Sequence, residues 1–225
     1  EVKSKNGINQ SNFSVKVLNL CSRRRRKKNK RKSKHSAMFR KKEPRHRIFI
    51  QGLSSATSEV YQRQVIGQKT YNGVALLSRF PLMEVQKGFK NGYDPENARL
   101  ISAEVQGLHI INAYVPQGQT VESDKFRYKL EFLEQFRKEL EEFPDHQPLL
   151  VMGDFNIAPE TRDLAAPEVM AGKVSFHPDE HAWLRQVQQL GFTDLFREYE
   201  SGAGHYSWWD YRTRGFERDE GMRID

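Results

Sequence analysis

Two polar residues directly follow a hydrophobic run in the second half of the chain. Residues 149–152 read Leu-Leu-Val-Met, and Gly153 separates them from Asp154 and Asn156. The apolar run predicts a buried strand, and side chains two apart on an extended chain point the same way, so both are expected on one face. Asp can hold a divalent metal or take a proton from water, and Asn can stabilise a developing charge. The pair indicates phosphoryl chemistry, with an Asx-rich turn as the plain alternative.

The strands needed to place this pair are visible upstream. Residues 74–78 form a short apolar run after an Asn-Gly turn signal, which predicts a buried strand. Residues 100–105 and 108–114 flank Gln106-Gly107, a pattern typical of a hairpin with a two-residue loop. Both arms of this hairpin are apolar on both faces, so we expect central strands that are covered on each side.

Two stretches with a helical period lie on either side of the Asp154 strand. Residues 122–143 place apolar side chains along one stripe, and residues 178–190 form a second amphipathic pattern. Between the strands, residues 81–97 predict a Gly-rich polar connection. Residues 223–225 predict the entry to a further strand, and we expect the sequence to be cut short there.

The charge is distributed unevenly along the 225 residues. The net charge is +8, yet residues 1–66 hold 19 Lys and Arg against 3 Asp and Glu, so the remaining residues are acidic overall. Residues 23–34 are almost entirely basic, a composition that cannot bury enough apolar surface to fold alone. We expect residues 1–66 to be a basic, poorly ordered or aberrant segment, and residues 67–225 to be one truncated domain. The basic block is either a nucleic-acid arm or a solvated tail.

Several classes of protein are excluded by composition. A single cysteine, Cys21, rules out an internal disulfide framework and a cysteine metal cluster. No apolar run is long enough to span a bilayer, and no signal-peptide pattern opens the sequence. We therefore expect a cytoplasmic protein without a membrane partner, and a monomer. The missing initiator Met indicates a fragment or a processed start.

Three motifs stand together in one order along the chain. They are Asn-Ala-Tyr-Val-Pro-Gln-Gly at 112–118, Gly-Asp-Phe-Asn-Ile-Ala-Pro at 153–159, and Ser-Trp-Trp-Asp-Tyr-Arg at 207–212 closing on Gly-Met-Arg-Ile-Asp at 221–225. In this order they resemble bacterial exodeoxyribonuclease III, within the endonuclease/exonuclease/phosphatase superfamily. Residues 67–78 and 98–102 match the same family, and the resemblance covers residues 67–225.

The resemblance implies a fold and an activity. The fold is α+β, a two-sheet β-sandwich flanked by helices in the four-layer α/β/β/α arrangement of DNase I-like proteins, here incomplete. The activity is that of a hydrolase of DNA repair, a nuclease acting as 3′-to-5′ exodeoxyribonuclease and abasic-site endonuclease in base excision repair. The implied partner is double-stranded DNA with abasic sites or 3′ ends. The implied cofactor is Mg²⁺, with Mn²⁺ as the alternative.

The resemblance also assigns roles to individual residues. Asp154 would activate the attacking water, Asn156 would stabilise the transition state, and both would hold the metal. Tyr114 would stand at the scissile phosphate, and Asp225 would orient a catalytic histidine. The implied contacts to the substrate are Tyr71, Arg99, Gln117, Trp208 and Arg212.

Some of these residues have structural alternatives. Tyr114 could instead cap the core, and Arg99 could form an ion pair. Trp208 and Trp209 alternate on a strand, so one should be buried while the other faces the substrate. His109 follows an apolar pattern and is expected to be a satisfied sheet residue rather than a ligand.

Two departures from the family predict weak or no activity. The family's metal-binding Glu, in a Gln-Glu-Thr-Lys motif, has no counterpart before Gly67, and its terminal Ser-Asp-His would follow Asp225. A shifted reading frame would explain the basic first third, because glutamate codons read one base out become arginine and lysine codons. The rival functions are a superfamily phosphatase and a non-catalytic nucleic-acid-binding remnant.

Overall fold

The computed structural model describes residues 15–19, 62–69 and 71–225. Among residues 15–19 it describes the backbone only. The strands are β1 (Val15–Asn19), β2 (Gln62–Gly67), β3 (Gly73–Ser78), β4 (Met83–Lys87), β5 (Leu100–Val105), β6 (Leu108–Tyr114), β7 (Leu149–Asp154), β8 (Trp208–Trp209) and β9 (Gly221–Met222). The α-helices are α1 (Asp124–Glu141), α2 (Pro167–Met170), α3 (Pro178–Gln189) and α4 (Leu195–Tyr199), with 3₁₀ turns at Thr161–Asp163 and Gly215–Arg218.

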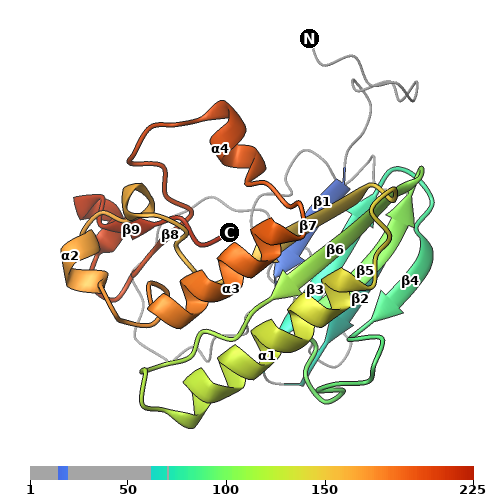
Figure 1. The fold of residues 1–225 in the computed structure, drawn as a ribbon, viewed down its shortest axis with the longest axis horizontal. Coiled ribbons are helices and arrows are strands. Elements are labelled where there is room, and N and C mark those ends of the chain that lie inside the picture. Colours follow the sequence, from blue (N-terminus) through green and yellow to red (C-terminus); the bar gives the residue numbers. More distant parts are fainter. Residues whose placement is uncertain (1–14, 20–61, 70) are drawn as a thin grey trace, which may run out of the picture.

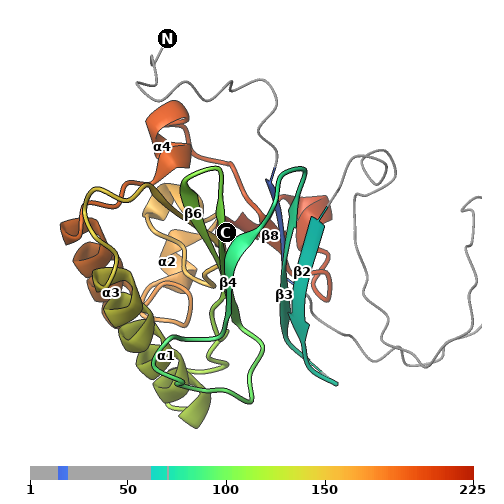
Figure 2. The same ribbon diagram turned by 90° about the vertical axis from the view of Figure 1, so that its right-hand side faces the viewer.

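Two sheets pack face to face (Figure 2). One has the order β1-β3-β2 and is antiparallel; the other has the order β4-β5-β6-β7, in which only β6 and β7 are parallel. The core between them comes from strands β3, β5 and β6, and includes Val74, Leu76, Ile101, Ala103, Val105 and Ile110. Sheet faces rich in aliphatic side chains are stabilised by this mutual burial. A short third sheet joins β8 to β9.

Helices α1 and α3 cover the other face of the four-stranded sheet, side by side (Figure 1). The apolar stripe of α1 supplies Phe132, Leu133 and Phe136 to this second core. Trp183 of α3 stacks on Phe136 and donates its indole N–H to the Leu133 carbonyl at 2.6 Å. The described residues thus form a helix layer over two sheets, which confirms the α+β sandwich.

The hairpin predicted between residues 100 and 114 is confirmed. Gln106 and Gly107 both have positive φ, 51° and 80°, as a two-residue type I′ turn requires. The strands it joins lie in the middle of the four-stranded sheet, as their two-sided apolar pattern predicts. The helices predicted over residues 122–143 and 178–190 are also present, as α1 and α3.

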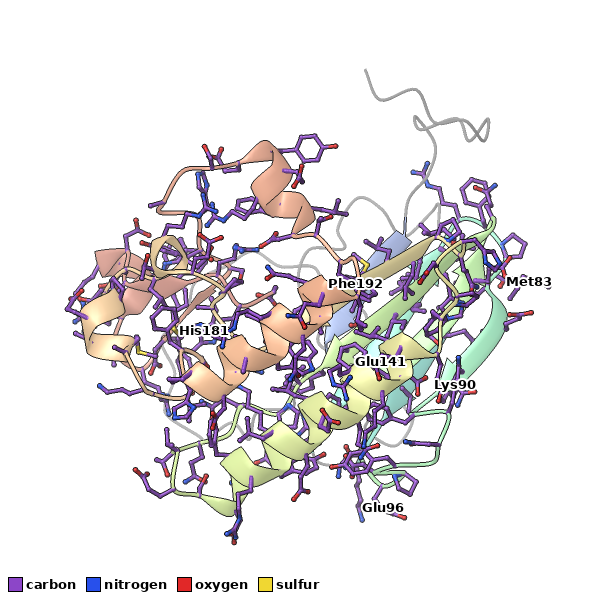
Figure 3. All side chains as sticks on the ribbon, in the orientation of Figure 1. Met83, Lys90, Glu96, Glu141, His181 and Phe192 are labelled. Carbon is purple, nitrogen blue, oxygen red and sulfur yellow. The ribbon has the colours of Figure 1, made fainter. Side chains whose placement is uncertain are left out.

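Two local expectations were wrong. The connection predicted over residues 81–97 contains β4, whose alternation is hidden by a bulge: Glu84 has φ 49°, the register shifts there, and Met83 lies exposed at the sheet edge (Figure 3). Strands β1 and β2 come from residues 1–67 and both pair with β3, while the wider expectation for residues 1–66 stays a prediction. Residues 223–225 form no strand.

Some expectations fall outside the described residues. These include the expected lack of order in the basic block at 23–34. The division of the chain at residue 67 stays a prediction, although β2 ends at that residue. Within the described part of the chain, no helix is long and apolar enough to cross a membrane.

Candidate active site

The parallel pairing of β6 and β7 brings the first two predicted site residues together. Tyr114 and Asp154 are register partners at the ends of these strands. The chain beyond remains paired, because Val115 N–H donates to the Asp154 carbonyl at 2.9 Å. Two motifs that lie forty residues apart in the sequence therefore meet at one edge of the sheet.

Gly153 makes this close approach possible. Its φ is 134°, and a Cβ built there would lie 2.0 Å from the Ala113 carbonyl oxygen and 2.8 Å from Asn112 Oδ1. No side chain fits between the two strands at this point, so glycine is required on both steric and conformational grounds. The glycine before Asp154 is thus part of the geometry of the site.

Asn156 does not share an extended face with Asp154, contrary to the sequence expectation. Its φ is 52°, and its N–H donates to Asp154 Oδ1 at 2.9 Å, which closes an Asx turn. The Asn156 side chain is 7% exposed and donates from Nδ2 to the Val115 carbonyl at 2.9 Å. The turn expected as the plain alternative is therefore present, and it ties the Asp154 carboxylate to the backbone of Asn156.

Asp154 is electrostatically perturbed. Burial raises its pKa to about 7, and the carboxylate of Asp225 adds to the rise. The N–H of Asn156 and the cations of Lys129 and Arg99 act in the opposite direction without cancelling it. A carboxyl poised near neutrality is one of the marks of a functional site.

Asp225 reaches Asp154 because the last residues run beside the end of β7. Phe155 N–H donates to the Ile224 carbonyl at 2.9 Å, and the C mark of Figure 1 lies close to β7. Burial raises the pKa of Asp225, while a hydrogen bond with Ser207 opposes the rise. The hydroxyl of Ser207 also accepts from Ile224 N–H at 3.0 Å. Thus the Ser207 motif and the terminal aspartate are physically joined.

An ionic clamp fixes this terminal segment. Arg223 donates to Asp163 Oδ1 at 2.6 Å and to Asp194 Oδ2 at 2.6 Å, and its own N–H donates to the Asp163 carbonyl at 2.9 Å. Arg197 also binds Asp163, whose side chain is fully buried. Because ions this deeply buried are stable only when paired, the clamp restricts where Asp225 can lie.

Arg99 lies against Tyr114. Its Nη1 donates to the Tyr114 carbonyl at 3.1 Å, and its guanidinium carbon is 5.1 Å from the centre of the Tyr114 ring. These contacts of Arg99 are to a backbone carbonyl and an aromatic ring, and not the ion pair that the sequence offered as an alternative. Tyr114 is half-buried against the core between the sheets, so it caps that core while remaining at the strand end.

The other predicted substrate contacts lie on loops. Tyr71 is 53% exposed, in a loop that Gln68 and Asn72 tie to Asn97, two residues before Arg99. Gln117 is exposed, and its Oε1 accepts from the N–H two residues on at 2.8 Å. These loops bring Tyr71 and Gln117 to the two strand ends that carry Arg99 and Tyr114.

The tryptophan pair does not divide into one buried and one free residue. Trp208 is half-buried against Ala158, Leu164 and Ile224, beside the terminal segment. Trp209 is also half-buried, with edge contacts to Tyr206 and Phe216. The alternation inferred from the sequence assumed a longer strand, whereas β8 has only two residues.

Arg212 is held by its own loop. Its side chain is largely exposed and binds Asp210 through two nitrogens, with Nη2 to Oδ2 at 2.9 Å and Nε to Oδ1 at 3.0 Å. A phosphate would have to compete with this carboxylate.

A buried lysine was missed by sequence reasoning. Lys129 of α1 and Glu180 of α3 form an ion pair with neither side chain exposed. Burial lowers the pKa of Lys129, and Glu180 opposes that shift. The available signal was a position three residues after Phe126, within the apolar stripe of the helix. A lysine on that stripe needs a buried acidic partner.

His109 was expected to be satisfied, and it is not. The ring is 6% exposed and lies 4.7 Å from the Phe143 ring, and neither of its nitrogens has a hydrogen-bond partner in the described part of the chain. Burial lowers its pKa, so the neutral ring is favoured. It lies at the first register position of β6 with β7, and Tyr114 lies at the last.

The chain was compared with known proteins. The model of the Endonuclease/Exonuclease/phosphatase family matches residues 24–225. The chain belongs to the Endonuclease/Exonuclease/phosphatase family. The match to this family begins within the segment that we expected to be aberrant, and it includes every site residue described above.

Three of the matching relatives are about one third identical to this chain over the aligned residues. Exodeoxyribonuclease III of Haemophilus influenzae is 35% identical over 172 residues, covering 71% of this chain and 64% of that protein. The structure of the 3′ phosphatase NExo from Neisseria bound to a product DNA hairpin has a TM-score of 0.69 at 36% identity, covering 72% of this chain and 65% of that one.

An AP endonuclease from Archaeoglobus fulgidus gives a TM-score of 0.67 at 34% identity, again covering 72% of this chain and 65% of that chain. The chain thus spans just under two thirds of the length of these relatives.

Proposed function

We propose that this chain carries the metal-dependent phosphodiesterase site of a DNA-repair nuclease, acting at abasic sites and at 3′ ends of duplex DNA. The observation that carries the proposal is the Asp154 carboxyl, with its pKa raised to about 7, next to Asp225 and closed by the Asn156 turn. The names and sequence identity of the relatives support DNA as the substrate.

Asp154 has the properties of a general base. A pKa near the working pH is the best compromise between the fraction of the carboxyl that is ionised and its strength as a base. One of its oxygens is oriented by the Asn156 N–H, so the carboxyl plane is fixed before substrate arrives. The Asn156 amide gives one of its two N–H groups to the Val115 carbonyl, and the second remains for a phosphate oxygen.

The cationic and aromatic residues at this edge suit a phosphate backbone. The Arg99 cation acts on the Asp154 carboxyl, although less strongly than the buried Lys129, and Tyr114 lies under its guanidinium. Arg99 Nε has no hydrogen-bond partner among the described residues. We assign Arg99, Tyr71 and Gln117 to the DNA backbone, Trp208 to the sugar at the lesion, and Arg212 to an outer phosphate.

A divalent metal fits this site only in part. Across residues 15–19, 62–69 and 71–225, no group of three or more His, Cys, Asp or Glu side chains gathers as a metal site. Asp154, Asp225 and the Asn156 amide would hold Mg²⁺, which commonly binds through one or two carboxylates and completes its shell with water and substrate phosphate. The bound ion would neutralise the phosphate oxygens. Weak activity is the expected result of so few protein ligands.

The test is cleavage of a duplex oligonucleotide with one abasic-site analogue, with Mg²⁺ or Mn²⁺ added. We expect the wild type to nick this duplex slowly. Asp154→Asn should reduce the rate by about 10³-fold or more, because it removes both the general base and a metal ligand. Asp145→Asn, an exposed aspartate on the α1–β7 loop, is the control and should leave the rate unchanged. Equal rates in wild type and Asp154→Asn would refute the proposal.

A second candidate function is removal of a 3′ phosphate from DNA, since the NExo relative is described as a 3′ phosphatase. A duplex with a nick bearing a 3′ phosphate, assayed beside the abasic duplex and a phosphoinositide, separates the three activities. Turnover of the phosphoinositide alone would favour a superfamily phosphatase. DNA binding with a steep salt dependence and no turnover of any substrate would favour a non-catalytic binder.

A further inference from the structure

The buried ion pair between Lys129 and Glu180 lies behind the candidate site rather than in it. Neither side chain is exposed to solvent. The two residues come from α1 and α3, the two helices that lie side by side over the four-stranded sheet (Figure 1). A buried pair is weak support for stability by itself, because desolvation offsets the attraction between the charges. Its other contacts therefore decide what it does.

Lys129 binds the backbone of both loops that carry predicted site residues. Its Nζ donates to the Asn156 carbonyl at 2.8 Å and to the Gln117 carbonyl at 3.4 Å. Its aliphatic stem packs over Gly118 together with Val174 and Phe126, and a Cβ added to Gly118 would lie 3.3 Å from Lys129 Cδ. One side chain thus spans the loop after β6 and the turn after β7.

Glu180 holds the neighbouring backbone. Its two carboxylate oxygens accept from Ser175 N–H at 3.2 Å and from His177 N–H at 2.9 Å. The Ser175 carbonyl in turn accepts from Ala158 N–H at 2.8 Å, two residues after Asn156. The next residue of α3, His181, binds the Ala158 carbonyl at 3.0 Å and is labelled in Figure 3. The segment that follows the Asx turn is therefore held by hydrogen bonds to α3 and to the residues just before it.

The Asx turn needs such support. Asn156 is a non-glycine residue in the left-handed region, a conformation that costs free energy and persists only when its surroundings impose it. The Lys129 ammonium binds the carbonyl of this same residue, and the Asn156 side chain is tied to Val115. A charged donor on a buried carbonyl is stronger than a neutral one.

We propose that Lys129 is a positioning residue, and that with Glu180 it forms a buried brace between α1 and α3 that fixes the Asn156 backbone and so orients the Asp154 carboxyl. The inference deepens the proposed function and rests on it for its kinetic readout. Lys129 touches no reacting atom, and it acts by holding the two loops in register.

Three variants separate positioning from stability: Lys129→Met, Glu180→Gln, and the double variant. Each single change leaves one buried charge unpaired and should lower stability, whereas the double change leaves none and should regain most of the loss. Lys125→Met, an exposed lysine on the same helix, is the matched control. Stability is measured by urea unfolding, and kcat and KM on the abasic duplex with Mg²⁺ at a temperature where every variant is folded.

We expect Lys129→Met to lower kcat by about 10²-fold with little change in KM, because small misplacements of catalytic groups have effects of this order. The double variant should remain equally slow although it is more stable. Glu180→Gln should lose stability but keep more activity, since its lysine still binds Asn156. Recovery of kcat together with stability in the double variant would overturn the proposal.

Hydrogen exchange of the Asn156 amide gives a readout that needs no activity. The amide should exchange about tenfold faster in Lys129→Met, the size expected when one supporting hydrogen bond is lost, while Ile111 in the sheet stays protected. Unchanged exchange at Asn156 would also overturn the brace. If wild type nicks no DNA at all, the proposed function fails while this exchange measurement still decides the inference.

Discussion

Replacing Asp154 by Asn is expected to stabilise the folded protein above neutral pH. Burial and the nearby Asp225 raise the pKa of Asp154 from 3.8 to about 7, so the folded chain holds this proton more tightly than the unfolded chain. The stabilisation from this group is complete below the unfolded pKa and is lost as pH rises through the folded one. Asn is uncharged at every pH and can still accept from the Asn156 N–H.

The magnitude follows from the difference between the two pKa values. Each pH unit of difference corresponds to about 1.4 kcal/mol, so ionising Asp154 in the folded state costs about 4 kcal/mol by pH 8. Between pH 5 and pH 8 the change is about 3 kcal/mol, since part of the penalty is already present at pH 5. This change is a large share of the free energy of unfolding of a typical domain, which is roughly 5–15 kcal/mol.

The assay is urea unfolding of wild type and Asp154→Asn at pH 5 and pH 8, without divalent metal. The stability advantage of the variant should grow by about 3 kcal/mol between the two pH values. The same comparison with Asp145→Asn, an exposed aspartate, should show no such growth. An advantage that does not depend on pH, or a variant less stable than wild type at pH 8, would refute the electrostatic reasoning.

Three further substitutions test residues that support the strands and the loop around the site. Gly153→Ala should prevent folding or cost more than about 3 kcal/mol in urea unfolding, because its Cβ would lie 2.0 Å from the Ala113 carbonyl. His109→Phe should make the protein less sensitive to acid than the wild type. Burial lowers the pKa of His109, so the stability that this residue contributes is complete above its pKa in the unfolded chain and is lost as pH falls. Asp163→Asn should cost about 3–5 kcal/mol, because the Arg197 and Arg223 cations lose the buried carboxylate that both of them bind, and nicking should fall with it.

The elements that carry the site were predictable where the hydrophobic period is long and undisturbed. The two-residue loop between apolar arms in residues 100–114 predicted the hairpin. The apolar stripe that runs over the five turns of α1 predicted that helix. β4 was missed because its bulge at Glu84 breaks the alternation on which strand prediction depends. β2 was missed because it follows the basic segment in the sequence and shows no clear period of its own.

Within the site, residue types were predictable and geometry was not. Asp154 and Asn156 were identified as a pair, but the extended face they were expected to share is an Asx turn with Asn156 in the left-handed region. Local spacing cannot reveal a turn that is imposed by distant contacts. Lys129 was passed over because its partner lies 51 positions away on another helix.

The sequence alone determined which chemistry is present: its motifs supply a carboxylate, an amide, a phenol and a terminal acid, since side-chain identity fixes donors, acceptors and charges. Only the tertiary structure decided that these groups meet. The parallel pairing of β6 with β7 sets Tyr114 beside Asp154, and the path of residues 223–225 brings in Asp225. The pKa of Asp154 depends on both, because burial and neighbouring charge are properties of the packed chain and not of the residue.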